Sequence, residues 1–169
     1  NNVSPEGAPV TIDMELKVGL QLARMFGYVD DPARPDCAFG HLTSGGTLAN
    51  FQALRLALAT KAFPLALAAA APPGIELPRD DWEAFNLPVP DTLALLDAWN
   101  AFLAGCGPKE RRQWRARLAA ERLETVGLAG FLARHPELGT PRVFAPVTAH
   151  YSWSKGMKFV GLGRAQLEL

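Results

Sequence analysis

Residues 40–50 read GHLTSGGTLAN, with two adjacent glycines between an apolar segment and a helix-forming one. The apolar segment, residues 37–43, has the length and composition of a short strand. Residues 48–60 are rich in Ala, Leu, Gln and Arg, which favour a helix. Because glycine has no Cβ, the chain can turn sharply between the two and its backbone can approach a ligand closely. The sequence therefore predicts a strand, a glycine turn and a helix.

The glycine turn, formed by Ser44, Gly45, Gly46 and Thr47, is a candidate anion-binding site. Free N–H groups and the positive dipole end of the following helix attract an anion such as phosphate. The hydroxyls of Ser44 and Thr47 add two possible hydrogen-bond donors. The turn is neither a Walker A loop nor a GxGxxG motif, so a purely structural tight connection is the alternative interpretation.

A second candidate site residue, His150, follows a short apolar strand predicted at residues 143–147 and precedes a predicted helix. In an open α/β sheet this order places His150 near the carboxyl edge, where ligands bind. An imidazole there can stack on a flat ring or transfer a proton near neutral pH. The alternative is a structural histidine bonded to a backbone carbonyl, which is the interpretation we favour for His41 and His135.

The other elements are predicted from apolar spacing, helix formers and prolines. We expect a loop at residues 1–9 and loops with short helical turns at 63–90. Helices are expected at 11–26, 91–103, 108–122 and 152–160, and a strand beginning at 166. Thr11 and Ser152 are the expected N-caps of two helices, and Gly161 and Gly163 fit the end of the last one. The arginines of the 108–122 helix are interpreted as a solvated face.

Composition excludes several classes of function. The 17 basic and 17 acidic residues balance, which argues against nucleic acid or an anionic membrane as partner. The two cysteines, Cys37 and Cys106, predict neither a disulfide framework nor a metal site. The most apolar run, residues 62–71, is shorter than the ~20 residues that cross a bilayer, and no signal peptide is recognised. We therefore expect a cytoplasmic protein.

Two stretches resemble one enzyme family. Residues 40–50 resemble the phosphate-binding segment of the group II pyridoxal-phosphate-dependent amino-acid decarboxylases, and residues 149–156, AHYSWSKG, resemble their histidine segment. Residues 1–3, 9–11 and Glu15 resemble the part of the family that precedes both. The likeness touches nearly the whole chain and is greatest for the bacterial tyrosine decarboxylase branch, including the long insertion before the histidine segment.

The resemblance implies an α/β fold: part of the large domain of the type I, aspartate-aminotransferase-like fold, incomplete at both ends. Residues 1–169 would be a partial cofactor-binding domain that contains a helical insertion at residues 63–140. Pyridoxal phosphate would place its phosphate on the turn of Ser44, Gly45, Gly46 and Thr47, and the catalytic His150 would stack on its ring. An aromatic amino acid is the implied substrate, and the family's active site lies at a homodimer interface.

Two parts of the family's machinery do not occur in these residues. The aspartate that pairs with the pyridinium nitrogen and the Schiff-base lysine both belong to motifs beyond the histidine segment, and neither Lys155 nor Lys158 matches the lysine motif. The chain also begins at Asn1 and ends inside a predicted strand, so we expect a fragment, inactive and poorly stable alone. Two alternatives remain: another enzyme of the same fold, such as an aminotransferase or carbon–carbon lyase, or a non-catalytic cofactor-binding protein.

Overall fold

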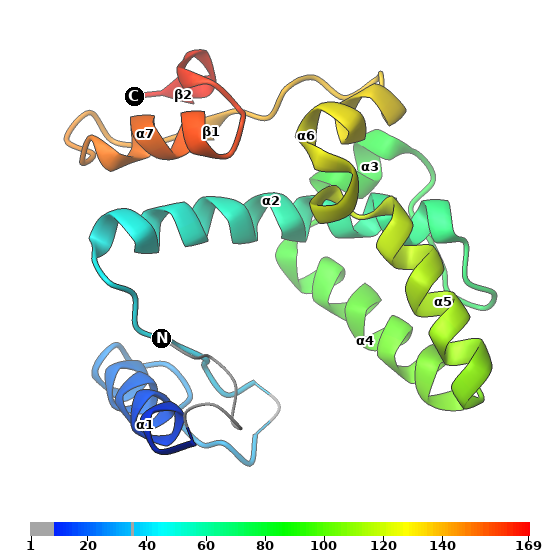
Figure 1. The fold of residues 1–169 in the computed structure, drawn as a ribbon, viewed down its shortest axis with the longest axis horizontal. Coiled ribbons are helices and arrows are strands. Elements are labelled where there is room, and N and C mark those ends of the chain that lie inside the picture. Colours follow the sequence, from blue (N-terminus) through cyan, green and yellow to red (C-terminus); the bar gives the residue numbers. More distant parts are fainter. Residues whose placement is uncertain (1–8, 35) are drawn as a thin grey trace. The chain divides into compact units, whose positions relative to one another are not determined.

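The computed structural model describes residues 9–34 and 36–169, so the loop predicted at residues 1–9 lies outside them except for Pro9, which begins a helix. The chain divides into two compact units, Asn1–Gly46 and Thr47–Leu169. In the described part, helices dominate and a two-stranded parallel sheet is the only sheet (Figure 1). The predicted α/β class is therefore confirmed only in part. The described residues are mostly helical and contain one very small sheet.

In the first unit, helix α1 (Pro9–Met25) supports an extended segment. Thr11 lies inside α1, so the prediction that it caps the helix is wrong. The strand predicted at residues 37–43 is also wrong, because this segment has no strand partner in the described chain and bonds instead to α1. Glu15 of α1 accepts a 2.6 Å hydrogen bond from the backbone N–H of Leu42.

Helix α2 (Gly46–Ala70) organises the second unit. It confirms the helix predicted after the glycine turn but runs on through Pro64, so the loop predicted from residue 63 is wrong in its first part. By length and hydropathy α2 could cross a membrane, a test that core helices of soluble proteins also pass. The second half of α2 lies in the core of this unit. Its buried residues are Ala62, Pro64, Leu65, Ala66, Leu67 and Ala70.

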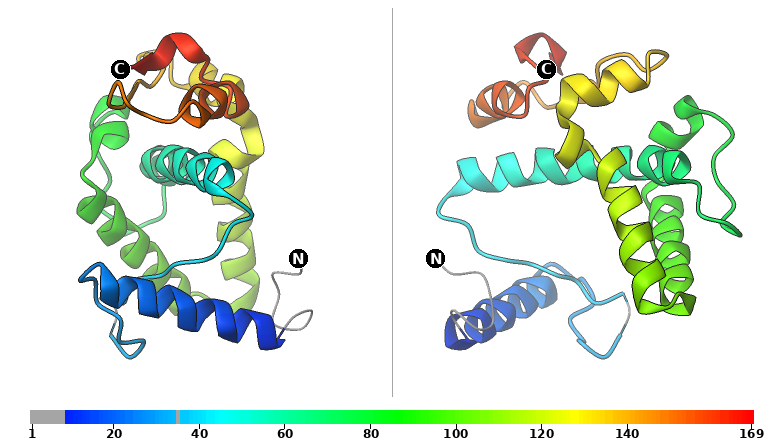
Figure 2. Two further views of the ribbon diagram at one scale, coloured as in Figure 1. Left: turned by 90° about the vertical axis from the view of Figure 1, so that its left-hand side faces the viewer. Right: turned by 45° about the vertical axis from the view of Figure 1, so that its right-hand side comes forward.

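Four helices surround this second half of α2, as Figures 1 and 2 show: α3 (Asp81–Asn86), α4 (Val89–Gly105), α5 (Pro108–Glu121) and α6 (Leu123–Arg134). One hydrophobic cluster joins α2 to α3 and α6, and another joins it to α4 and α5. The helices predicted at residues 91–103 and 108–122 are confirmed. Helix α6 was not predicted, because only an extended backbone at Arg122 (ψ 144°) separates it from α5.

The C-terminal part returns to the first half of α2. Strand β1 (Val143–Phe144) pairs in parallel with β2 (Leu167–Glu168), and α7 (Ser152–Phe159) lies between them in the sequence. Strand β1 is shorter than the predicted 143–147. Ser152 is the first helical residue of α7 and Tyr151 is the N-cap, so the capping role predicted for Ser152 is wrong. Gly161 and Gly163 have φ values of 80° and 81°, as expected where a helix ends.

Candidate functional site

The glycine turn has the backbone that the sequence predicts for a close approach to a ligand. Gly45 has φ 152°, a region that residues with a Cβ rarely adopt, and α2 begins at the next residue. The hydroxyl of Thr43 donates to the carbonyl of Gly45 at 3.1 Å and holds the turn. A Cβ built on Gly45 or Gly46 meets no atom within 4 Å, so the backbone here is open to an incoming group.

The charges at the start of α2 suit an anion. No acidic residue lies in the first turn of the helix, so no carboxylate competes for the N–H groups there. Ser44 is exposed and Thr47 is half-buried. The residues present therefore fit a phosphate group: open backbone donors, nearby hydroxyls and the positive end of a long helix.

His150 is exposed at the start of α7, and one ring nitrogen is anchored. Its Nδ1 lies 2.9 Å from the Ser152 hydroxyl and 3.2 Å from the Ser152 backbone nitrogen. The Tyr151 ring lies 4.2 Å from the imidazole, centre to centre, at an angle of 40°. The ammonium group of Lys155 lies over the Tyr151 ring, 4.5 Å from its centre. The imidazole is thus fixed at one edge and accessible to a ligand.

The last residues of the first motif and the histidine segment meet inside the second unit. The side-chain amide of Asn50, the last residue of the GHLTSGGTLAN stretch, donates a 2.7 Å hydrogen bond to the Ser152 hydroxyl, 102 positions later. Ser152 in turn contacts His150. Thr47 lies one helical turn before Asn50 on α2, so the end of the glycine turn and the histidine segment share one end of this helix. Sequence reasoning missed Asn50 and Ser152, although both lie inside the quoted motifs.

Close packing of α7 on α2 holds this contact in place. Gly156 of α7 is buried, and a Cβ built on it would lie 2.6 Å from Leu54 Cδ1 and 3.1 Å from Phe51 Cδ1. Met157 and Leu54 share a buried cluster, and the rings of Phe51 and Phe159 stack at 5.0 Å. The absence of a side chain at residue 156 therefore allows the two helices to approach closely.

The other two histidines have described contacts of their own. His135 Nδ1 lies 2.6 Å from an Asp81 carboxylate oxygen and the ring packs on Phe131, which ties the end of α6 to the start of α3. His41 packs on Phe39 in the first unit. The predicted structural interpretation fits His135. Cys106 is buried, and burial raises the pKa of its thiol, which does not suit a nucleophile.

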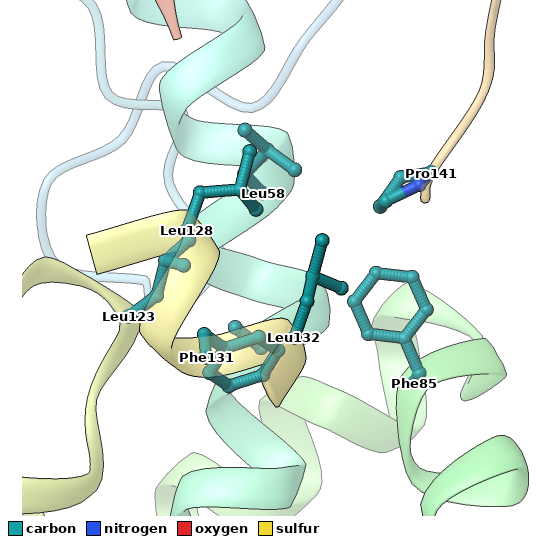
Figure 3. Close-up of a pocket in the computed structure, with 8 residues that line it drawn as sticks. Leu58, Phe85, Leu123, Leu128, Phe131, Leu132 and Pro141 are labelled. Carbon is teal, nitrogen blue, oxygen red and sulfur yellow. The ribbon is translucent and has the colours of Figure 1, made fainter. Parts of the chain in front are cut away.

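An apolar hollow lies between α2, α3 and α6, and it is not a ligand site. Figure 3 shows that only apolar side chains and Pro141 line it, and it is too narrow to admit a water molecule. Its lining residues include Phe85 and Phe131, which belong to a core cluster. The hollow is a packing defect of the core rather than a binding site.

The open glycine turn is a candidate anion-binding site, and the anchored imidazole of His150 is a candidate ligand-binding residue of the second unit. No family model matches the chain. It is a distant homologue of part of the bacterial L-tyrosine decarboxylases: it is 30% identical over 167 residues to the enzyme of Levilactobacillus brevis. It is also 28% identical to that of Enterococcus faecalis and 25% identical to that of Enterococcus faecium. Each match covers 99% of this chain but only 22–23% of the relative.

Proposed function

We propose that the complete protein containing this chain is a pyridoxal-phosphate-dependent decarboxylase that converts an aromatic amino acid, such as tyrosine, into its amine and CO2. The observation that carries the proposal is the contact of Asn50 with Ser152 and, through it, with His150. This contact joins Asn50, at the end of the first segment that resembles the decarboxylase family, to the histidine segment that resembles it as well. The homology to tyrosine decarboxylases supports the choice of reaction, because it extends over both segments.

In this proposal the glycine turn binds the phosphate of the cofactor. The N–H groups at the start of α2 and the hydroxyls of Ser44 and Thr47 donate to phosphate oxygens, while Gly45 and Gly46 keep the approach clear. Binding here is favourable because the first turn of α2 carries no acidic side chain. The turn therefore anchors the ligand without a covalent bond.

His150 supplies the flat surface of the site. Its imidazole, held at Nδ1 by Ser152, would stack on the cofactor ring and fix its orientation. When bound, pyridoxal phosphate supplies an electron-accepting ring for the electron pair released as CO2 leaves. A fixed ring plane matters because the bond to the carboxylate breaks most easily when it stands perpendicular to that plane. His150 thus contributes orientation.

The proposed activity belongs to the complete protein, of which this chain is a part. The chain spans 22% of the length of the first two relatives, and none of its lysines matches the family's Schiff-base motif. We therefore place catalysis in the complete protein, a cytoplasmic homodimer with the type I large-domain fold, in which residues 63–140 form a helical insertion. These residues alone are not expected to release CO2.

The test is an assay of the full-length protein with each of several amino acids, with and without added pyridoxal phosphate. The proposal predicts that tyrosine gives tyramine and CO2 in equal amounts, only when the cofactor is present. Glutamate serves as the non-aromatic control and is expected to react far more slowly. Transfer of the amino group to a keto acid without CO2 release would instead identify an aminotransferase and contradict the proposal.

A further inference from the structure

The hydrogen bonds around His150 identify which ring nitrogen carries the proton. The backbone N–H of Ser152 points at Nδ1 from 3.2 Å, and a backbone N–H can only donate. Nδ1 must therefore accept with its lone pair. In a neutral imidazole one nitrogen accepts and the other donates, so the proton of His150 lies on Nε2.

The side chains of Ser152 and Asn50 reinforce this assignment. The Asn50 amide donates to the Ser152 oxygen at 2.7 Å, which occupies a lone pair of that oxygen. The Ser152 hydroxyl proton is then directed to the neighbouring acceptor, Nδ1 of His150, at 2.9 Å. The three residues form one chain of donors running from α2 to the imidazole. The hydroxyl and the backbone N–H of Ser152 share Nδ1 as their acceptor, so both contacts require an unprotonated Nδ1.

The chain of donors is rigidly placed. Ser152 is fully buried, with 0% of its surface exposed, and it opens α7. Close packing of Gly156 on Leu54 fixes α7 against α2, the helix that carries Asn50. A buried, bonded hydroxyl of this kind limits rotation of the imidazole about its side-chain bonds.

We propose that Asn50 and Ser152 are positioning residues that hold His150 as the neutral tautomer protonated on Nε2. The nitrogen that remains free to meet a ligand is then a hydrogen-bond donor, which selects an oxygen acceptor on the bound molecule. The tautomer follows from the contacts of this chain alone, and only the identity of the ligand rests on the proposed function.

The experiment uses the full-length protein labelled with ¹⁵N-histidine, examined by NMR at about pH 8.5, where an ordinary imidazole is neutral. The His150 signals are assigned by their loss in a His150→Gln variant. We expect a protonated, pyrrole-type Nε2 and an unprotonated, pyridine-type Nδ1. A pyrrole-type Nδ1 would overturn the inference.

Asn50→Asp tests the direction of the chain. The isosteric carboxylate only accepts, so it takes the Ser152 proton and leaves the Ser152 oxygen as an acceptor facing Nδ1. The tautomer ratio is expected to shift about tenfold toward Nδ1–H, the effect of one reversed hydrogen bond. Asn100→Asp adds the same charge on exposed α4 and is expected to change nothing. An unchanged ratio in Asn50→Asp would contradict the proposal.

Ser152→Ala provides a second variant in case Asn50→Asp does not fold. It removes the hydroxyl donor but keeps the backbone N–H, so the ratio is expected to shift about threefold in the same direction. Ser154→Ala removes a hydroxyl two residues along the same helix and serves as control. Titration of the same samples with pyridoxal phosphate separates the two claims. Failure to bind it would defeat the proposed function, whereas the tautomer alone decides this inference.

Discussion

Gly156 has the strictest local requirement of the residues around the candidate site. Any side chain there must displace Leu54 and Phe51, whose atoms lie 2.6 and 3.1 Å from a built Cβ. Leu54 is 4% exposed and packs in a buried cluster with Met157, so it has little space to move. The close approach that brings Ser152 to Asn50 therefore depends on a glycine at this position.

We expect Gly156→Val to lower the free energy of unfolding by about 2–3 kcal/mol, as overpacking of a filled core does. The measurement is urea denaturation of the full-length protein followed by circular dichroism. Gly105→Val is the matched control, because that helical glycine has no atom within 4 Å of a built Cβ. Its effect should stay within about 0.5 kcal/mol. Equal effects of the two variants would contradict the described packing.

How far sequence predicts this site also differs from residue to residue. Gly45, Gly46 and His150 could be predicted as site residues because glycine pairs and histidines carry recognisable chemistry, and their roles stay predictions. Asn50 was missed because a polar residue in a helix usually faces solvent, and Ser152 because it was interpreted as an N-cap. Only the fold reveals that these two meet. Sequence separation of 102 positions hides such a contact from any local pattern.

At the scale of elements, α2 is the structure on which the second unit is built. Pro64 lacks an N–H and normally breaks a helix at a cost of about 3 kcal/mol, which is why the sequence predicted a loop. The helix continues because its second half buries side chains in two clusters: Leu65 faces α3 and α6, and Leu67 faces α4 and α5. Tertiary burial here outweighs local propensity.

Leu67→Ala tests this account of α2. Leu67 is completely buried, so truncation should lower the free energy of unfolding by about 2–5 kcal/mol. Leu56→Ala, on the same helix but 68% exposed, should cost less than about 0.5 kcal/mol. Chemical denaturation of both variants in the full-length protein gives the comparison. A small effect at Leu67 would mean that α2 is not held by the surrounding helices.

The sequence signals at element boundaries explain which of the shorter elements were predicted and which were not. Helices α4 and α5 have prolines at their starts, and α5 was predicted to within one residue and α4 to within two at each end. The boundary between α5 and α6 has neither proline nor glycine, only Arg122, so no sequence signal marked it. The strand expected before the glycine turn failed because a strand needs a neighbour, and its backbone is bonded to Glu15 instead.

At the scale of the whole molecule, many large apolar side chains remain exposed. Phe144 of β1 is 79% exposed and Val147, which follows this strand, is 78% exposed. Phe159 of α7 is 73% exposed. Exposed apolar surface of this kind usually marks an interface or an aggregation site. In the homodimeric decarboxylase that we propose, the rest of the large domain would cover it.

We therefore expect the isolated 169 residues to bind a hydrophobic dye and to aggregate, whereas the full-length protein does neither. Size-exclusion chromatography and dye fluorescence at equal concentrations make the comparison. A monodisperse monomer of the isolated chain with one sharp unfolding transition would contradict this prediction.

The central claim, that the turn at residues 44–47 binds the cofactor phosphate, is tested most directly by titrating full-length protein with pyridoxal phosphate. Gly46→Asp should still fold, because an acidic residue suits the first turn of a helix, but its carboxylate takes the place of the anion. We predict saturable binding to the unaltered protein and to Gly139→Asp, a loop control. For Gly46→Asp we predict affinity at least about 100-fold weaker. Equal affinity in all three proteins would contradict the assignment.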